Sequence, residues 1–322
     1  MLIISKKEQE SLIDMKEVIS YVEEAFIAFA SKETQTPVRT TLPFKEKSTA
    51  LFMPSVSDKL ENLGIKVVNV VPENRSRNMK TINGIVLLFD INTGVPKALL
   101  EGSYITQIRT GAISGVATKY LAKKDAKILG IIGTGEQAKG LCKAICTVRD
   151  IKKVILFNRT RDKAKLFAAY VEGEIGIETD VESNANKVVN RSDIIVTATN
   201  ASTPVYSNDL KKGMHVNAVG SFRPSMQEVP SSSVINADKV IVESKEAALE
   251  ETGDLQKPLN EGFSSEELLE LGDILIGLRE GRVNEEEVTV FKSVGLAVVD
   301  IIVAQYLFEK AIKNGLGKNF SL

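Results

Sequence analysis

Apolar residues near the N-terminus recur with the spacing of one helix face. Between Met15 and Ala30 the apolar stripe consists of Val18, Ile19, Val22, Phe26 and Phe29. Asp14 precedes the segment, and its carboxylate is suited to capping the first turn. We therefore predict an amphipathic helix over residues 15–30, and we expect its apolar face to pack on a sheet.

The pattern changes to strands between residues 39 and 100. The segments ALFMPSV, LGIKVVNVV and INGIVLLFDINTGVPKALL alternate or run apolar, with turn signals such as Asn92-Thr93-Gly94. Strands joined by short turns pair in antiparallel fashion. We therefore predict a mostly antiparallel sheet in this part of the chain.

From Ala126 onward, short apolar runs alternate with helical segments. In chain order they are KILGIIG, EQAKGLCKAICTV, KKVILFN, RDKAKLFAAYV, a short strand near Thr179, SDIIVTAT, GMHVNAV and DKVIVES. This alternation predicts an α/β fold with a doubly wound parallel sheet of the Rossmann type. The tail from Val288 to Lys313 has one long helical pattern, which we expect to return to the first domain.

Length, composition and charge narrow the class of protein. A chain of 322 residues favours two domains, and 43% hydrophobic with 26% charged residues is typical of a globular protein. The formal net charge of -1 offers no general attraction for nucleic acid or anionic membranes. No run approaches the ~20 apolar residues of a membrane span, and the N-terminus lacks a cleavable leader pattern. We expect a cytoplasmic protein that binds neither nucleic acid nor membranes.

Cysteine and histidine offer little catalytic chemistry. Cys142 and Cys146 lie four apart in a helical segment, on one face, and we interpret them as packing residues. The single histidine, His215, lies in an apolar run. A histidine relay or a metal site is therefore disfavoured, and the chemistry must come from other charged side chains or from a cofactor.

A glycine-rich turn follows the first strand of the Rossmann-like region. It fits G-x-G-x-x-G/A through Gly133, Thr134, Gly135, Glu136, Gln137 and Ala138. The apolar strand before it and the helical run after it are the context that a dinucleotide pyrophosphate needs, because backbone N–H groups converge at the helix start. The alternative is an ordinary turn between strand and helix.

The end of the second strand bears on cofactor choice. An NAD-selective fold carries an acidic residue there, whereas this chain has Asn158, Arg159 and Thr160. A guanidinium and a hydroxyl can hold the 2′-phosphate of NADPH. We predict that NADPH is preferred and that NADH remains usable; the alternative is a solvated arginine at a helix start.

Three separated segments, RTGAISGVATKYLA, GTGEQA and FKSVGLAVVD, resemble the ornithine cyclodeaminase and mu-crystallin family. The resemblance implies a Rossmann domain, residues 119–292, inserted in an α+β substrate-binding and dimerisation domain made of residues 1–118 and 293–322. It also implies a homodimer.

The same resemblance implies roles for individual residues. Arg39, Lys66 and Arg109 would grip the substrate carboxylate, with Lys66 and Arg109 catalytic and Arg109 also facing the cofactor. Lys66 lies in an apolar strand, where it needs an anionic ligand or partner unless its amine reaches solvent. Further cofactor contacts would come from Thr81, Thr199, Val216, Asn217, Ala218 and Val294. Gly295 would contact the substrate beside the nicotinamide.

One departure from the family pattern concerns the reaction. Cyclodeaminases resemble Gly-Gly-Asp where this chain reads Gly220-Ser221-Phe222, so Phe222 replaces the aspartate that handles the substrate amine. Phenylalanine cannot act as a general base. The sequence instead resembles the ketimine reductases. We expect NAD(P)H-dependent reduction of 1-pyrroline-2-carboxylate to L-proline, with 1-piperideine-2-carboxylate, giving pipecolate, as a related substrate.

Several alternatives stay open. An amino acid dehydrogenase of the alanine dehydrogenase type would depend on ammonia, and ornithine cyclisation is disfavoured by Phe222. Dehydrogenation of larger, opine-like conjugates would require a larger pocket. A non-enzymatic protein that retains NADPH and binds a hydrophobic ligand is a further class.

Overall fold

The computed structural model describes residues 1–321, without the side chain of Arg75. The chain divides into two compact units, Met1–Arg109 with Leu296–Leu322, and Thr110–Gly295. The divisions lie within a helix and before the last long helix, near the boundaries expected from the sequence. The assignment of substrate binding and dimerisation to residues 1–118 and 293–322, and of the cofactor to residues 119–292, stays a prediction.

The first unit contains an antiparallel sheet with helices on one face. Its elements are β1 (Leu2–Ile4), α1 (Lys6–Leu12), α2 (Met15–Ala30), β2 (Thr40–Phe44), β3 (Ser48–Ser57), β4 (Asn62–Val70), the 3-10 helix η1 (Pro72–Arg77), β5 (Ile82–Phe89), β6 (Pro96–Glu101), the start of α3 (Gly102–Leu121), α11 (Ala297–Lys313) and β15 (Lys318–Asn319). The strand order is β15-β1-β6-β5-β4-β3-β2, and only the β1–β6 pair is parallel among the described residues. The prediction of a mostly antiparallel sheet is confirmed.

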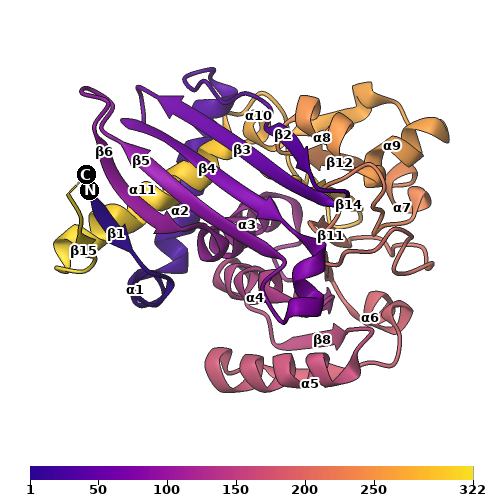
Figure 1. The fold of residues 1–322 in the computed structure, drawn as a ribbon. Helices are drawn as coiled ribbons and strands as arrows, with labels where there is room; N and C mark the ends of the chain where they lie inside the picture. Colours follow the sequence, from indigo (N-terminus) through magenta and orange to yellow (C-terminus); the bar gives the residue numbers. More distant parts are fainter. Residues whose placement is uncertain (322) are drawn as a thin grey trace. The chain divides into compact units, whose positions relative to one another are not determined.

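Helix α2 forms where the sequence predicts it. Helix α2 has the predicted bounds, and the Asp14 carboxylate accepts hydrogen bonds from the backbone N–H groups of Lys16 and Glu17. Its apolar face packs mainly on α11, which itself contacts β3, β4 and β5 (Figure 1). The packing of α2 on the sheet itself stays a prediction. The short helix α1 was not anticipated.

Strand β4 shows how α11 is seated. The residues of β4 that face α11 are buried in alternation with partly exposed ones, and Lys66 is among the buried ones. At Gly64, on the same face, an added Cβ would lie 2.8 Å from the Leu87 carbonyl oxygen and 2.9 Å from Ile301 Cδ1. Helix α11 therefore approaches β4 closely at Gly64, two residues before Lys66.

The second unit contains a parallel sheet with helices along it. Its elements are the end of α3, β7 (Ile128–Ile132), α4 (Glu136–Val148), β8 (Lys153–Phe157), α5 (Arg161–Tyr170), the π-helix η2 (Val171–Ile175), β9 (Glu178–Val181), α6 (Ala185–Arg191), β10 (Ile194–Thr197), β11 (His215–Ala218), α7 (Ser231–Ile235), β12 (Lys239–Val242), α8 (Lys245–Glu251), α9 (Gly253–Asn260), η3 (Ser265–Glu267), β13 (Leu268–Glu270), α10 (Leu271–Leu275) and β14 (Thr289–Lys292).

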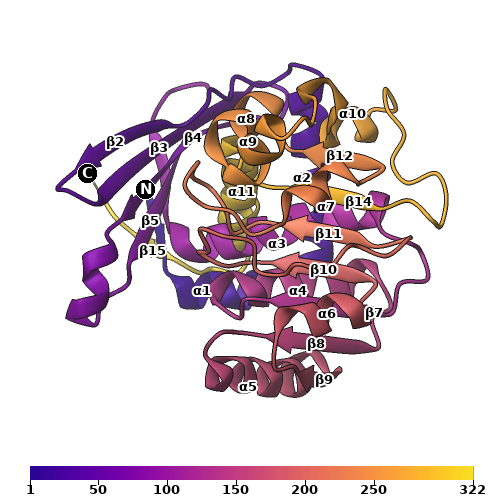
Figure 2. The ribbon, with the colours of Figure 1, turned by 90° about the vertical axis from the view of Figure 1, so that its right-hand side faces the viewer.

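The strand order is β13-β12-β14-β11-β10-β7-β8-β9, and every pairing described is parallel (Figure 2). This arrangement confirms the doubly wound prediction. The chain runs outward from β7 in one direction to β9 and then restarts beside β7 at β10. The sheet therefore has a topological switch point between β7 and β10, where such folds bind their ligands.

The C-terminal segment corrects one expectation. Residues Val288–Lys313 were predicted as one helix, but Thr289–Lys292 forms β14 between β11 and β12. All four residues of this strand are buried, so they show no alternation to distinguish strand from helix. Gly295 then has a φ of 100°, which ends the extended segment, and the helix begins only at Ala297.

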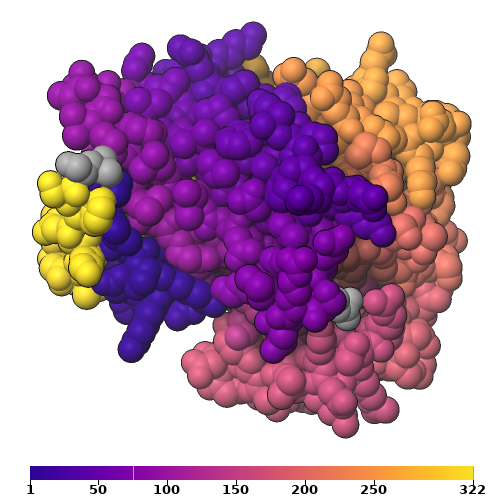
Figure 3. Space-filling view, in the orientation of Figure 1, coloured from indigo at the N-terminus to yellow at the C-terminus, as the bar shows by residue number. Residues whose placement is uncertain are grey.

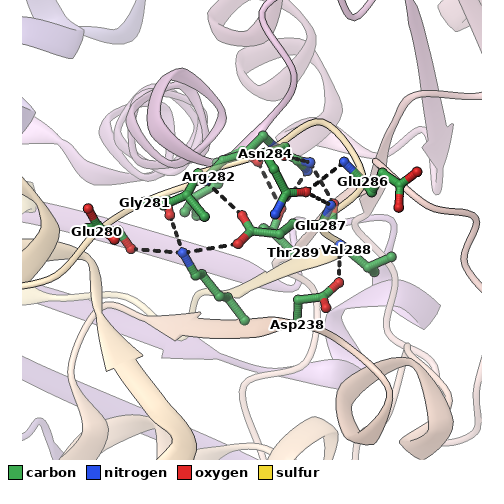
Figure 4. Close-up of polar contacts among 12 residues, drawn as sticks. Asp238, Glu280, Gly281, Arg282, Asn284, Glu286, Glu287, Val288 and Thr289 are labelled. Atoms are coloured by element: carbon green, nitrogen blue, oxygen red, sulfur yellow. Dashed lines mark hydrogen bonds and ion pairs between the residues drawn. The ribbon is translucent and has the colours of Figure 1, made fainter.

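Arginines stabilise the amino edge of the parallel sheet. Arg282 donates to the carbonyl oxygens of Leu121 and Met214. It also donates to the Glu287 carbonyl oxygen, just before β14 (Figure 4). Arg149, the C-cap of α4, donates to carbonyls at the end of α3, with distances of 2.8 Å to Thr118 and 2.9 Å to Ala122, the residue after the helix. Burial lowers the pKa of both guanidinium groups.

We predict that Arg149→Met lowers the free energy of unfolding by about 2–3 kcal/mol, because it leaves several buried carbonyls without a donor. Chemical denaturation measures this change. Lys143→Met, at an exposed position on α4, is the matched control and should stay within about 0.5 kcal/mol of wild type. Equal loss in both variants would contradict the prediction.

Helices in the described part of the chain are all too short or too polar to cross a membrane.

Candidate active site

The switch point of the parallel sheet holds the glycine turn. Gly133 follows β7 with a φ of 99°, a left-handed value that favours glycine. An added Cβ would lie 2.5 Å from the Ala198 carbonyl oxygen and 2.7 Å from Thr199 Cγ2, both just after β10. Glycine is therefore required here by the close approach of two strand ends.

The start of α4 has the features of an anion site. Its N-cap is Gly135, and no side chain caps the first turn among the described residues. A Cβ on Gly135 would meet no atom within 4 Å, so the space before the helix is open. The Thr134 Oγ1 and Gln137 Oε1 atoms are buried without a hydrogen-bond partner in the described chain. Free N–H groups and unpaired polar atoms fit a dinucleotide pyrophosphate.

Other members of the motif have supporting positions. Glu136 is exposed at the start of the helix, and Ala138 is buried beneath it. Asn158 Oδ1 accepts from the Thr134 backbone N–H at 3.5 Å, and Asn158 Nδ2 donates to the Thr160 carbonyl at 2.9 Å. The end of β8 is thus connected to the glycine turn.

A buried glutamate not foreseen from the sequence organises the loops after β10 and β11. Glu228 accepts from the backbone N–H groups of Thr199 and Gly220, both at 2.5 Å, and of Ser221 at 3.1 Å. Burial raises the pKa of Glu228, and the nearby Lys292 ammonium opposes that shift. The predicted cofactor residue Thr199 and the segment leading to Phe222 are therefore held by one carboxylate.

A second buried carboxylate, that of Glu243, accepts hydrogen bonds from the loop after β14. Glu243 Oε2 accepts from the backbone N–H of Val294 at 3.1 Å and of Gly295 at 2.6 Å. Its other oxygen accepts from Ser293 Oγ at 2.7 Å. The turn that carries the predicted residues Val294 and Gly295 thus has a defined shape at the carboxyl edge of the sheet.

The remaining predicted cofactor residues differ in position. Val216, Asn217 and Ala218 all lie in β11, with Ala218 at its carboxyl end and Val216 inside the sheet. The Asn217 side chain donates to Thr118 Oγ1 at 3.0 Å. Thr81 lies in the first unit between η1 and β5, where its carbonyl accepts from the Val71 N–H at 2.7 Å.

Lys66 has its anionic partner within the first unit. Its Nζ lies 2.7 Å from Asp300 Oδ1, and Arg109 Nε lies 3.0 Å from the same oxygen. Lys66 and Asp300 have relative exposures of 1% and 0%. The three side chains come from β4, α3 and α11, so two predicted site residues meet on one carboxylate. The need for an anionic partner inferred from the apolar strand is met by Asp300.

The surroundings of Lys66 lower its proton affinity. Burial is the main cause that brings the pKa of Lys66 down to about 7; the Asp300 carboxylate raises it, and the charges of Arg109 and Arg39 lower it. Arg39 lies partly buried just before β2. The three predicted cations therefore act on one another electrostatically, and Lys66 can exchange a proton near neutral pH.

Asp300 carries a sequence signal that could have been used. It is a lone acid within the apolar run VGLAVVDIIVAQ, and an unpaired carboxylate is rarely buried in a helix. Glu228 and Glu243 carry no such signal, because their partners are backbone groups from distant loops.

His215 is buried with Nδ1 2.9 Å from Thr289 Oγ1, and burial lowers its pKa to about 3. Cys142 packs in the core of the parallel sheet, as predicted.

Comparison with known proteins identifies relatives over the whole chain. Residues 1–315 match the model of the "Ornithine cyclodeaminase/mu-crystallin family". A Delta(1)-pyrroline-2-carboxylate reductase of Bacillus cereus (strain ZK / E33L) is 60% identical over 321 residues, 99% of each chain. The structure of Thermococcus litoralis Delta(1)-pyrroline-2-carboxylate reductase with NADH and L-proline is 40% identical, with a TM-score of 0.95 and coverage of 99% of this chain and 100% of that one.

An archaeal alanine dehydrogenase, solved as a dimer with bound NAD, is 33% identical with a TM-score of 0.93, covering 100% of this chain and 99% of that one. The resemblance noted in the sequence is thereby confirmed. The chain belongs to the ornithine cyclodeaminase and mu-crystallin family.

Proposed function

We propose that the chain is an NAD(P)H-dependent reductase that converts 1-pyrroline-2-carboxylate to L-proline. The observation that carries the proposal is the buried cluster of Lys66, Arg109 and Asp300, whose two cations share one carboxylate. The cluster has a net positive charge, increased by Arg39, and is suited to a small carboxylate substrate. The pyrroline-2-carboxylate reductase that is 60% identical to this chain supports the same substrate.

The residues of the chain account for the reaction as follows. Arg39 and Arg109 hold the substrate carboxylate and so orient the C=N bond. Gly133, Thr134 and Gly135 would hold a reduced nicotinamide cofactor, which would supply the hydride for C2 of the substrate. The Lys66 ammonium gives a proton to the ring nitrogen, so that the C=N double bond becomes a C–N single bond with one N–H. Lys66 is then neutral and regains a proton from solvent.

Phe222 excludes the competing chemistry. Cyclodeamination needs a base that removes a proton from the substrate amine, and no base is present at this position. A preformed cyclic imine needs no such base, because only a hydride and a proton are added. Phe222 therefore favours reduction of the ring over its formation.

Product analysis tests the proposal. Incubation with 1-pyrroline-2-carboxylate and NADPH should yield L-proline without added ammonia, as measured by chiral chromatography. An alanine dehydrogenase would form an amino acid from pyruvate only when ammonia is present. Binding of NADPH without any product would favour the binding-protein alternative and contradict the proposal.

We further propose that the cofactor is NADPH in preference to NADH. Arg159 follows β8 and is exposed, where its guanidinium is free to meet a ribose 2′-phosphate, and no acid in Asn158-Arg159-Thr160 would repel that phosphate. The Thermococcus litoralis relative was solved with NADH, so NADH is the alternative cofactor against which the proposal must be tested.

We predict that Arg159→Asp raises the KM for NADPH by about 10- to 100-fold and changes the KM for NADH by less than about 3-fold, since only NADPH carries the phosphate that the new carboxylate repels. Steady-state kinetics with each cofactor measures the ratio. Lys165→Asp, at an exposed position on α5, is the control. A wild-type enzyme with equal KM values for both cofactors would contradict the NADPH preference.

Assembly and location complete the proposal. The face of the first sheet opposite α11 carries apolar side chains from neighbouring strands, including Phe52, Ile65 and Leu87. Among the described residues of the first unit, no helix lies on this face (Figures 1 and 3). We propose that a second copy of the chain covers this face, as the alanine dehydrogenase dimer suggests. Sedimentation equilibrium should give the mass of two chains, and a monomer would contradict this. The free thiols Cys142 and Cys146 suit the cytoplasm.

A further inference from the structure

Asp300 occupies a position in the cationic cluster that stability alone does not explain. Its Oδ1 accepts from both Lys66 Nζ and Arg109 Nε, at 2.7 Å and 3.0 Å. Its Oδ2 is buried without a hydrogen-bond partner among the described residues. A buried carboxylate that leaves one oxygen unpaired is costly. Such a group is expected where it serves the site rather than the fold.

Helix α11 and strand β4 place the Asp300 carboxylate beside Lys66. Asp300 lies in the first turn of α11, where the helix dipole favours a negative charge. Gly64, two residues before Lys66 on the same face of β4, permits the close approach of α11. Across the neighbouring strands, Lys66 pairs with Met53 and Val86, which are apolar. The charged groups that act on Lys66 are therefore Asp300 from α11, Arg109 from α3 and Arg39 from the segment before β2.

We propose that Asp300 is the positioning residue of the reaction: it fixes Lys66 and Arg109 side by side and keeps the Lys66 amine protonated for transfer to the imine nitrogen. This inference rests on the proposed function and adds a residue to it. Without the Asp300 charge, burial and two arginine charges would all favour the neutral amine. Lys66 would then lack the proton that the reduced ring nitrogen receives.

The proposal predicts a specific pH dependence. The pKa of Lys66 is about 7, and the protonated form is the active one, so turnover should fall as pH rises through about 7. Asp300→Asn removes the charge that raises this pKa, so the falling limb should move about one to two pH units lower. At pH 7 turnover should drop about 5- to 50-fold and recover on acidification.

A matched control separates this role from a structural one. Asp150 also pairs with two lysines, Lys127 at 2.8 Å and Lys152 at 2.6 Å, but it is exposed and outside the site. Asp150→Asn should leave the pH profile of turnover unchanged. If Asp300→Asn lowers turnover by the same factor at every pH, Asp300 acts only on the structure and the proposal is overturned.

Two further measurements keep the test decisive. In a Lys66→Met background, Asp300→Asn should no longer move the falling limb of the pH profile, because that shift acts through Lys66; a shift as large as in the wild-type background would overturn the proposal. An NMR titration of the Lys66 amine in folded wild type and Asp300→Asn needs no turnover, and an unchanged pKa would also overturn it. If the pKa shifts but the wild type reduces no cyclic imine, the proposed function fails while the pairing stands.

Discussion

Replacement of Lys66 by methionine is expected to lower kcat/KM for 1-pyrroline-2-carboxylate by about 10³-fold. Methionine fills most of the same buried volume on β4, so packing against α11 is kept. The variant loses the proton donor, a transition-state contribution of about 10²- to 10⁴-fold, and part of the charge that holds the substrate carboxylate. Steady-state kinetics measures the loss, and fluorescence of bound NADPH should show an unchanged Kd for the cofactor.

A strand lysine outside the cluster provides the comparison. Lys153 begins β8 and pairs with Glu178 at 2.8 Å and Asp180 at 3.0 Å, with its side chain partly exposed. Lys153→Met removes an ion-paired lysine from a strand just as Lys66→Met does, and its turnover should stay within about 2-fold of wild type. If Lys66→Met retained more than about a tenth of wild-type turnover, Lys66 could not be the proton donor.

Replacement of Gly133 by alanine is expected to raise the Kd for NADPH by more than about 100-fold, or about 2.7 kcal/mol. An alanine at a φ of 99° is strained, and its Cβ would meet the Ala198 carbonyl oxygen at 2.5 Å. The ends of β7 and β10 must then separate, which displaces the turn that faces the cofactor. Fluorescence titration of the folded variant measures the Kd.

Gly173→Ala is the matched control for this strain. Gly173 lies in η2, and an added Cβ there would meet no atom within 4 Å. The Gly173 variant should bind NADPH as wild type does. Wild-type binding by a folded Gly133→Ala would contradict the assignment of the switch point as the cofactor site.

Periodicity along the chain was sufficient to predict most of the second unit. The runs around Gly133 have strands, helices and turn in the order that a Rossmann fold requires, and each is long enough to show its period. The four residues of β14 are too few and too uniformly buried to show one, so they were merged with α11. The packing of α2 on α11 depends on a segment more than 250 residues away, which local pattern does not encode.

The candidate site likewise contains residues that the sequence predicted and residues that only the structure reveals. Arg39, Lys66 and Arg109 were predicted from the family resemblance, and an anionic partner for Lys66 was expected from its apolar strand. The identity of that partner, Asp300, depends on how α11 packs on β4. Glu228 and Glu243 act on backbone N–H groups, which have no signature in the amino-acid sequence.

The most direct test of the reductase assignment compares three reactions of one enzyme preparation by absorbance at the nicotinamide band. These are NADPH oxidation with 1-pyrroline-2-carboxylate, NADPH oxidation with pyruvate plus ammonia, and NAD reduction with ornithine. The account predicts that kcat/KM for the cyclic imine exceeds the other two by at least about 100-fold, a difference of about 2.7 kcal/mol in transition-state stabilisation. Faster turnover of pyruvate plus ammonia, or of ornithine, would contradict it.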